Sequence, residues 1–382
     1  MKIPITRPQL DAAEEAAVLE VLRSGWVAQG PRVAEFETAL AMYTDARFAV
    51  ATTSCTTALH LILAGLGIGA GDEVIVPAFT FVATANVVEC AGATPVFADI
   101  DPRTFNLAVE DLDRRVSART RALVVVHLFG LSADLDPILA LGRRHGLVVL
   151  EDAACALGTR YHNRHAGTGG TAGAFSFHPR KVITTGEGGA VTTDDPVLAE
   201  RLQVLRNHGG RVSDLERHRT GAFTLPEYDE VGFNYRMTDL QAALGIVQLA
   251  KADRLIAARQ RLAQRYTEAF GDFEGLATPV VPPGCVHTYQ SYVCLVGEEA
   301  PVGRDELAEA LGAEGIAVRQ GTHAVHALGY YRRKYGLEEG DYPNASRADR
   351  RSLTLPLYPD LSTAEQDQVI EGVRRCWGRS GG

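Results

Sequence analysis

Short runs of β-branched residues alternate with segments of helical length along the first half of the chain, and this alternation constrains the fold most strongly. We predict strands over residues 73–76, 95–98, 122–126, 147–150, 174–177 and 189–192. Helical segments lie between them, such as 54–66, which Ser54 can cap, and 134–145. This pattern is typical of a mostly parallel sheet covered by helices, so we predict an α/β domain of about 230 residues.

The pattern changes after residue 238. Residues 240–270 keep a helical spacing of apolar side chains with no proline, which predicts one long helix of the kind that ties two domains together. Beyond it we predict a strand at 291–296, a helix at 304–311 and a terminal helix at 363–376, which form a smaller α+β domain. A length of 382 residues fits two domains. We predict a large domain of residues 1–249, with the N-terminal segment, and a small C-terminal domain of residues 250–382.

Composition and charge exclude several classes of protein. The net charge of −9 and the lack of a long basic run argue against nucleic acid as a partner. The N-terminal residues show no signal-peptide pattern, and no apolar run reaches the ~18 residues of a membrane span. Six cysteines without CxxC spacing indicate neither a zinc site nor a disulfide framework. We therefore expect a soluble protein of the reducing cytoplasm.

Lys181 stands out by its surroundings. It lies between the predicted strand 174–177 and a glycine pair at 188–189 that opens the next strand. The two phenylalanines of the strand, together with Val182, limit hydration and can keep the amine neutral, so that it can form a Schiff base with an aldehyde. A solvated loop lysine is the alternative reading, and the other candidate residues must decide between the two.

An anion cradle and an acid occur earlier in the chain. Ser54, Thr56 and Thr57 stand where a helix begins, and hydroxyl and free backbone N–H groups there can bind a phosphate. Glu151 and Asp152 end an apolar strand, at the edge where ligands of open α/β sheets bind. An ordinary helix cap is the alternative for each. In chain order, the cradle and the acid precede Ser176 and Lys181, and together these are the groups that pyridoxal phosphate needs.

Two glycine-rich segments carry a different interpretation. Residues 65–73 follow a helix and precede a strand, the reverse of a dinucleotide-binding loop, so we predict a helix exit and a turn. Residues 167–173 lack the GK[ST] ending of a triphosphate loop and predict a flexible connection. A nicotinamide dehydrogenase would need a glycine loop between its first strand and helix, and the chain has none there.

Eight ordered motifs resemble those of the DegT/DnrJ/EryC1/StrS family of sugar aminotransferases. They are SCTTALHL (54–61), GDEVIVPAFTFVATAN (71–86), GATPVFADID (92–101), VVVHLFG (124–130), LEDAACALG (150–158), FSFHPRKVITTGEGG (175–189), RNHG (206–209) and GFNYRMTDLQAALG (232–245). The resemblance runs from about residue 3 to residue 249, with a weaker match at 353–362. It implies the aspartate aminotransferase-like fold type I, pyridoxal phosphate as cofactor and a homodimer.

The resemblance also implies roles for single residues. Lys181 would form the Schiff base with the cofactor and move the proton between the substrate carbon and the cofactor. Asp152 would keep the pyridinium nitrogen protonated, so that the ring accepts electrons. Phe81 would stack on the ring, with a core aromatic residue as the alternative.

Further implied roles concern the phosphate. The backbone amides of Cys55 and Thr56, with the Ser176 hydroxyl, would bind it. Asn234 would reach it from the neighbouring subunit, so that dimerisation completes each site. Arg236 would meet a carboxylate of the amino donor, or lie at the surface or interface.

Several residues depart from the family or stay open. Cys55 often has glycine in its place, and Cys155, near the ring in relatives, has glutamine or histidine; Cys155 is then a weak S–H donor or a filler. His178 either contacts substrate or packs its loop. His323 and His326 have helical spacing but no third ligand nearby, so we predict no metal site. We assign them, with residues 26–30, to the sugar-nucleotide entrance.

The resemblance predicts a two-step transamination. L-Glutamate would convert the cofactor to its pyridoxamine form, and a nucleotide-linked keto-deoxysugar would then receive the amine. NYRMTDLQAA (234–243) is more similar to members that act at C4 of an NDP-4-keto-6-deoxyhexose than to those that act at C3, which stays an alternative. Lys181 argues against a dehydratase branch that has histidine there. A non-catalytic ligand-sensing regulatory protein is the remaining alternative; it would lack Lys181 or Asp152, or carry a basic DNA-reading segment.

Overall fold

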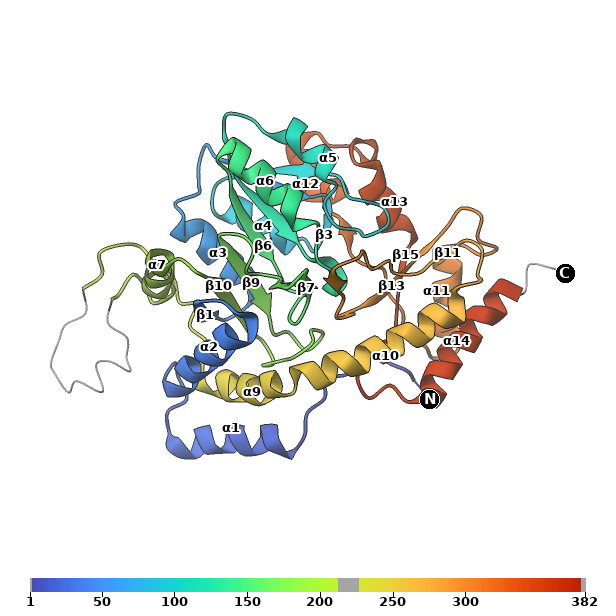
Figure 1. Cartoon of the computed structure of the whole chain (residues 1–382), viewed down its shortest axis with the longest axis horizontal. Coiled ribbons are helices and arrows are strands. Elements are labelled where there is room, and N and C mark those ends of the chain that lie inside the picture. The colour runs from blue at the N-terminus through green and yellow to red at the C-terminus, as the bar shows by residue number, and fades with distance from the viewer. Residues whose placement is uncertain (1, 212–226, 379–382) are drawn as a thin grey trace.

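A seven-stranded, mostly parallel sheet forms the centre of the larger part of the molecule (Figure 1). The computed structural model describes residues 2–211 and 227–378. The strands are β1 (Phe48–Thr52), β2 (Glu73–Pro77), β4 (Thr94–Ala98), β5 (Thr120–Val126), β6 (Val148–Asp152), β9 (Ala172–Ser176) and β10 (Gly189–Thr193). Their order is β1-β10-β9-β6-β5-β2-β4, and β10 is antiparallel to both of its neighbours. The predicted α/β class is confirmed, and each predicted strand overlaps one of these.

Strand β1 was not predicted. Its sequence, FAVAT, contains two alanines, which strands disfavour. It is held by antiparallel pairing with β10, where Phe48 lies opposite Thr193. The pairing joins segments far apart in the chain, so local sequence carries little sign of it.

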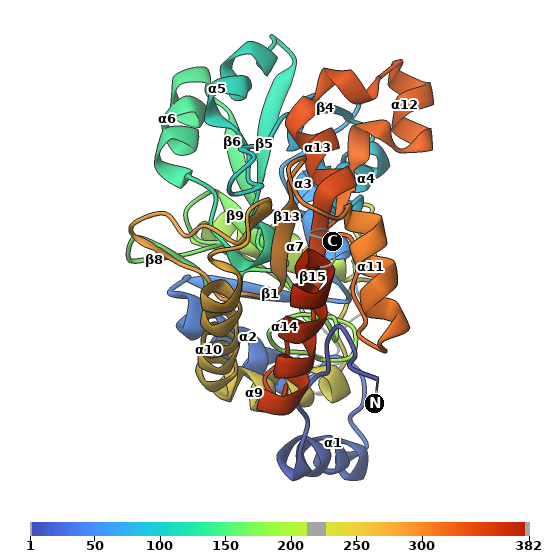
Figure 2. The ribbon, with the colours of Figure 1, turned by 90° about the vertical axis from the view of Figure 1, so that its right-hand side faces the viewer.

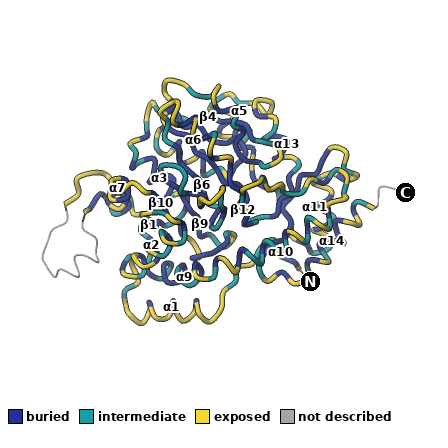
Figure 3. The backbone as a smooth tube through the Cα atoms, in the orientation of Figure 1, coloured by how far each residue is buried: buried dark blue, intermediate teal, exposed yellow. Residues whose placement is uncertain are grey.

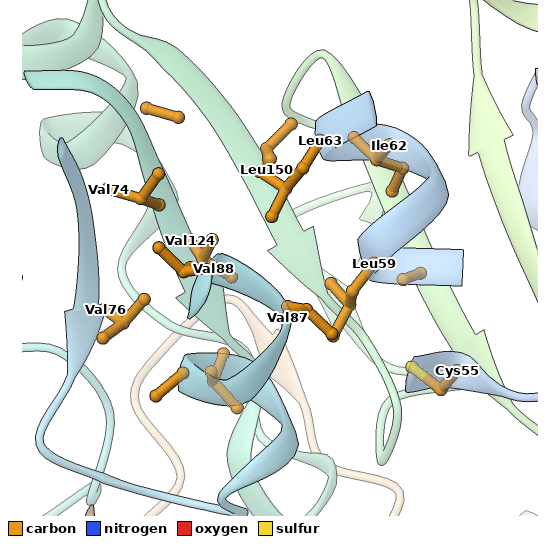
Figure 4. Close-up of a cluster of buried hydrophobic side chains, with 14 of the residues drawn as sticks. Cys55, Leu59, Ile62, Leu63, Val74, Val76, Val87, Val88, Val124 and Leu150 are labelled. Atoms are coloured by element: carbon orange, nitrogen blue, oxygen red, sulfur yellow. The ribbon is translucent and has the colours of Figure 1, made fainter. Parts of the chain in front are cut away.

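Helices cover both faces of the sheet. On one face lie α3 (Cys55–Gly65), α4 (Ala83–Cys90) and α7 (Pro196–Arg206), and on the other lie α2 (Pro31–Thr44), α5 (Val109–Leu112), α6 (Leu135–His145) and α9 (Asp239–Ala250). Strand residues alternate between the faces: Leu150 packs in the cluster of α3 and α4 (Figure 4), whereas Val149 packs in that of α6. The sheet is therefore buried on both sides (Figure 3).

The start of α3 is set by its own side chains. Ser54 and Thr57 form a capping box, in which the Ser54 hydroxyl accepts the Thr57 amide and the Thr57 hydroxyl accepts the Ser54 amide. This confirms the predicted helix and its cap. The chain then turns through Gly67 and Gly71, both at positive φ, into β2, as predicted for residues 65–73.

The predicted long helix is instead two helices, α9 and α10 (Ala252–Phe270), which meet at Lys251. The Lys251 amine donates to Asp11 (2.8 Å) and to Glu14 (2.7 Å) at the start of α1 (Ala12–Ser24). The break coincides with this contact, which the local sequence does not show. Helix α10 leads from the sheet into the smaller part of the molecule (Figure 1).

A three-stranded antiparallel sheet lies in the smaller part, covered by helices (Figure 2). Its elements are β11 (Leu276–Ala277), β13 (Tyr292–Val296), β15 (Ser352–Leu355), α11 (Arg304–Ala313) and α14 (Thr363–Gly378). They confirm the strand and the two helices predicted here. Two further small sheets are present. One has the order β12-β7-β8, with β12 (Cys285–Val286), β7 (Arg160–Tyr161) and β8 (Arg164–His165), and the other pairs β14 (His323–Ala324) with β3 (Phe79–Thr80).

Packing crosses the predicted domain boundary in both directions. Ile3 lies in the core of the smaller part, with Tyr266 and Leu307. Helices α12 (Gly329–Tyr335) and α13 (Pro343–Arg351) pack on the core of the larger part through Tyr331 and Ala345. The division at residue 249 stays a prediction. Among the described residues, no helix combines the length and apolar character that crossing a bilayer requires.

Candidate active site

A cavity of about 300 Å³ opens between the carboxyl ends of the sheet strands and the smaller part of the molecule. Asp152 at the end of β6 and Ser176 at the end of β9 lie in one wall, and Gln290 and Arg319 of the smaller part lie in the other. The predicted site residues that line it are Cys55, Thr56, Phe81, Asp152, Cys155, Ser176 and Lys181. The fold thus brings together residues spread over more than a hundred positions, at the edge where open α/β sheets bind ligands.

The beginning of α3 faces this cavity with two backbone amides. The Ser54 and Thr57 hydroxyls are committed to the capping box, which leaves for the predicted cradle the Thr56 hydroxyl and the amides of Cys55 and Thr56, which as first-turn groups have no carbonyl partner within the helix. A Cβ at Gly189 would lie 2.3 Å from the Ser54 carbonyl carbon and 2.5 Å from the Cys55 nitrogen. Glycine there is what allows β10 to approach the helix start so closely.

Asp152 is held by two donors and is only 6% exposed. Its Oδ1 accepts the Ala154 amide at 3.1 Å, and its Oδ2 accepts the Thr84 hydroxyl at 2.8 Å. Cys55 Sγ lies 4.0 Å from Oδ1. Sequence reasoning missed Thr84. No local pattern marks it, because Thr80 ends β3, Thr84 lies in the first turn of α4, and the contact that matters is with Asp152 of β6.

The Lys181 amine lies 3.2 Å from the Cys155 sulfur. Burial by itself lowers the pKa of this amine, but the negative charges available to Cys155, Cys55 and Asp152 raise it, and the net direction is upward. Burial also raises the pKa of the Cys55 thiol. The amine is therefore protonated at neutral pH.

This protonated amine differs from the neutral lysine expected from the sequence. The flanking aromatic residues do not surround the amine: Phe177 packs edge-on against Phe36 of α2, and Phe175 lies in the same core cluster. The Cys155 sulfur beside the amine raises the pKa of Lys181 most, Cys55 and Asp152 add to this effect, and together they outweigh desolvation.

Glu151, the residue before Asp152, points to the other face of the sheet and is fully buried. Its carboxylate accepts the backbone amides of Gly167 (2.7 Å), Gly169 (2.7 Å) and Gly170 (2.6 Å). The prediction of a flexible connection at residues 167–173 is therefore wrong, because the amides of this segment bind Glu151.

His127 completes the surroundings of Glu151. Its Nδ1 accepts the Ala133 amide at 3.1 Å, so the proton sits on Nε2, which donates to Glu151 at 2.7 Å. Burial by itself raises the pKa of Glu151, but the His127 contact and the glycine amides lower it, and the net direction is downward. Glu151 is thus an ionised anchor of the fold, outside the cavity.

Two predicted residues lie away from the cavity. Asn234 is exposed and forms a backbone bridge with Asn207, and the Arg236 guanidinium donates to the Asn207 side chain at 2.9 Å. The predicted role of Asn234 belongs to a neighbouring subunit and stays a prediction. His178 lines the cavity, and its Nδ1 accepts the Arg180 amide at 3.2 Å, which fits the reading that it packs its loop; contact with substrate stays a prediction.

The residues assigned to the sugar-nucleotide entrance are scattered. His326 is 0% exposed and lies 3.3 Å from the Ser346 hydroxyl, so its assignment to an entrance is wrong. His323 is exposed on β14, opposite Thr80 of β3. Residues 26–30 do not line the cavity; the Gly30 amide binds the Asp239 carboxylate at 2.8 Å. Within the described residues, no group of three metal-binding side chains occurs.

Arg319 and Gln290 line the cavity and were not predicted. Arg319 is exposed, and its backbone pairs with Thr354 of β15. The Gln290 side chain donates to the Arg180 carbonyl at 2.7 Å and so links the smaller part to the Lys181 loop. Both residues follow Lys181 by more than a hundred positions and belong to no recognised motif, so no signal in the sequence marks them.

These groups fit pyridoxal phosphate. The two free amides at a helix start suit a phosphate, the buried carboxylate has acceptor positions left over for a protonated ring nitrogen, and the lysine amine lies in the same cavity. Phe81 is 59% exposed at this cavity, which leaves its ring face available for stacking.

Comparisons with known proteins agree with this arrangement. The sequence model of the DegT/DnrJ/EryC1/StrS aminotransferase family matches residues 8–374. The spore coat polysaccharide biosynthesis protein SpsC of Bacillus subtilis (strain 168) is 44% identical over 374 residues, which are 97% of this chain and 96% of that protein.

Solved structures show the same fold. DesV of S. venezuelae, in complex with a ketimine intermediate, is 36% identical with a TM-score of 0.90 over 99% of both chains. The PLP-form of the putative sugar aminotransferase Spr1654 of Streptococcus pneumoniae is 30% identical with a TM-score of 0.92 over 100% of both chains. PseC of Helicobacter pylori, involved in pseudoaminic acid biosynthesis, is 29% identical with a TM-score of 0.93, over 99% of this chain and 100% of that one.

Proposed function

The chain belongs to the DegT/DnrJ/EryC1/StrS aminotransferase family, and from this membership we propose that it moves an amino group from L-glutamate to C4 of a nucleotide-linked 4-keto-6-deoxyhexose. The coarser part of this statement stands on the comparisons: the protein is a sugar aminotransferase of fold type I that uses pyridoxal phosphate. The observation that carries the proposal is the single cavity that holds Lys181, Asp152 and the start of α3.

When bound, pyridoxal phosphate supplies an aldehyde for amines and a ring that withdraws electrons from the neighbouring carbon. In our proposal, the amides of Cys55 and Thr56 and the Ser176 hydroxyl bind the phosphate. Phe81 packs against the ring face. These contacts fix the ring before any proton moves.

Asp152 and Lys181 then divide the acid–base work. Asp152 would accept a hydrogen bond from the protonated ring nitrogen and would keep that proton in place, because a buried carboxylate stabilises a positive charge beside it. The Lys181 amine must first give up its own proton; in its neutral form it would take the proton from the substrate carbon and return it on the neighbouring atom, as a positioned base and acid. Cys155, 3.2 Å from the Lys181 amine, orients that amine.

Residues outside the cavity extend the proposal. We assign Asn234 to the phosphate of the neighbouring subunit's site, which requires a homodimer; its exposure on this subunit supports that reading. Arg236, on the same segment, is assigned to a donor carboxylate. The C4 preference rests on residues 234–243. The six cysteines lie in the described residues and form no disulfide, which supports a cytoplasmic location.

The test has two steps. Purified protein with pyridoxal phosphate is first treated with L-glutamate, and we expect its visible absorbance to bleach as the cofactor takes up the amine. GDP-, UDP- and dTDP-linked 4-keto and 3-keto sugars then follow, with product mass and proton couplings as the readout. Amination of a 3-keto sugar alone would contradict the C4 assignment. A protein that binds no pyridoxal phosphate would contradict the proposed aminotransferase activity.

A further inference from the structure

A line of two buried hydroxyl groups leads to the carboxylate of Asp152. Thr84 Oγ1 lies 2.8 Å from Asp152 Oδ2, and Thr80 Oγ1 lies 3.1 Å from Thr84 Oγ1. Both threonines are 1% exposed. Thr80 belongs to β3 and Thr84 to the first turn of α4, so one short segment carries the pair.

The chemistry of these groups fixes the direction of both hydrogen bonds. An ionised carboxylate only accepts, so the single hydroxyl proton of Thr84 must go to Asp152. That proton is then unavailable to Thr80, so Thr80 donates to Thr84. Hydroxyls joined in this way strengthen each other's hydrogen bonds, and the surroundings are too dry for water to replace them.

We propose that Thr84 is a positioning residue for the transamination, and that it holds Asp152 in the orientation that receives the ring nitrogen of pyridoxal phosphate. The inference rests on the proposed function. The Ala154 amide binds Oδ1 and the Thr84 hydroxyl binds Oδ2, so each oxygen has one N–H or O–H donor, and the Cys55 thiol lies 4.0 Å from Oδ1. A carboxylate has about four acceptor positions, and these two bonds leave the rest free for a ligand in the cavity.

Comparison with Glu151 separates positioning from simple burial. The Glu151 carboxylate accepts three amides and one imidazole N–H, so its acceptor positions are filled by the protein. Asp152 has half as many donors from N–H and O–H groups, although it is nearly as buried. Thr84 therefore restrains the orientation of a carboxylate that keeps capacity for a ligand.

The test removes only the hydroxyl. Thr84→Val keeps the shape of the side chain, Thr84→Ser keeps the hydroxyl, and Thr44→Val is the matched control, because Thr44 is equally buried but donates to the Leu40 carbonyl in α2. Each protein is loaded with pyridoxal phosphate labelled with ¹⁵N in the ring, and the ¹⁵N chemical shift and the dissociation constant of the cofactor are measured.

We expect Thr84→Val to move the ¹⁵N signal toward that of an unprotonated ring and to weaken cofactor binding about tenfold, the effect of one lost hydrogen bond. Thr84→Ser restores both values, and Thr44→Val changes neither. If the valine protein does not fold, Thr84→Ala takes its place against Thr84→Ser, with the same two readouts.

Two outcomes would overturn the inference: a wild-type ¹⁵N shift in the protein without the hydroxyl, or equal shifts in the serine and hydroxyl-free variants. Failure of the proposed function looks different. In that case the wild-type protein itself binds no pyridoxal phosphate or does not bleach with L-glutamate. A wild-type protein that does both, beside an unaffected Thr84→Val variant, contradicts the role of Thr84 alone.

Discussion

Glu151 and Asp152 are neighbours on β6, yet they serve opposite sides of the sheet. Glu151 is surrounded by four donors from the protein, whereas Asp152 has two and lines the cavity. The difference follows from the pleat of a strand, which sends consecutive side chains to opposite faces. Burial alone therefore does not distinguish the two carboxylates; the number of acceptor positions left free does.

The glycine segment at 167–170 supplies the backbone amides that bind Glu151. A Cβ at Gly170 would lie 2.4 Å from the Val149 carbonyl oxygen, so the segment can approach β6 only without a side chain there. Its amides then replace water around the buried charge. On the Asp152 side, by contrast, the space next to the carboxylate is kept open.

We expect the largest effect from a change at Asp152, on the side of the sheet that faces the cavity. Asp152→Asn keeps the size of the side chain but removes the charge beside the ring nitrogen. We expect the rate of the glutamate half-reaction to fall about 10³-fold, equivalent to about 4 kcal/mol, with little change in the free energy of unfolding. Stopped-flow absorbance and urea unfolding measure the two quantities. An unchanged rate together with a lower free energy of unfolding would contradict the proposed difference between Asp152 and Glu151.

Glu151→Gln should do the opposite. The neutral amide cannot accept from all four donors, and we expect the free energy of unfolding to fall by about 3 kcal/mol, as for other broken buried charge contacts. The folded fraction should bind pyridoxal phosphate and bleach with glutamate like the wild type. Urea unfolding and half-reaction rates check this, and a stable variant that has lost the half-reaction would show that Glu151 belongs to the catalytic machinery.

Low pH should decrease the free energy of unfolding of the wild-type protein through groups near Glu151. Burial lowers the pKa of His165, which precedes the glycine segment, to about 4, so the unfolded chain takes up a proton at higher pH than the folded chain. The stability that neutral His165 contributes is present above the ordinary histidine pKa and is lost as pH falls toward 4. Glu151, whose pKa is also lowered, adds a loss of the same sign at still lower pH.

From pH 7.5 to pH 5 we expect the free energy of unfolding to decrease by about 2 kcal/mol through His165. Urea titrations at several pH values measure it. An unfolding free energy that stays constant over this range would mean that His165 is as easily protonated in the folded protein as in the unfolded chain.

Gly189→Ala tests the cradle with a smaller effect. The added methyl group meets the Ser54 and Cys55 backbone and must displace the start of α3, so we expect cofactor affinity to fall about tenfold, equivalent to about 1.4 kcal/mol. Gly312→Ala in α11, where a Cβ meets no atom within 4 Å, is the matched control. Equal cofactor affinities in the two variants would show that the α3 amides do not bind the phosphate.

Motifs at strand ends could be read from the sequence, because each strand run has a clear apolar pattern and its last residue is then defined. Lys181, Asp152 and Ser176 were found this way. Thr84 was missed because its function depends on a contact with β6 that local pattern does not encode. Glu151 and Asp152 were predicted as a pair at one strand end; strand alternation explains their opposite directions, and the partners of Glu151 come from a loop that was predicted to be flexible.

Other differences also have tertiary causes. The break at Lys251 coincides with its contacts to Asp11 and Glu14, residues more than two hundred positions away. The raised pKa of Lys181 depends on Cys155, Cys55 and Asp152, which come near the amine only in the folded chain. Arg319 enters the site through the packing of the smaller part on the larger one. In each case the local structure or charge depends on residues far away in the chain, so a short stretch of sequence does not predict it.

The central claim is that the Lys181 amine in this cavity carries the cofactor. The chain has four lysines, and two of the others are held in ion pairs: Lys251 with Glu14 and Lys334 with Glu89. The most direct measurement is borohydride reduction of protein loaded with pyridoxal phosphate, followed by peptide mass spectrometry. The account predicts the pyridoxyl group on Lys181, before L-glutamate is added and not after; a group on any other lysine, or on none, would contradict it.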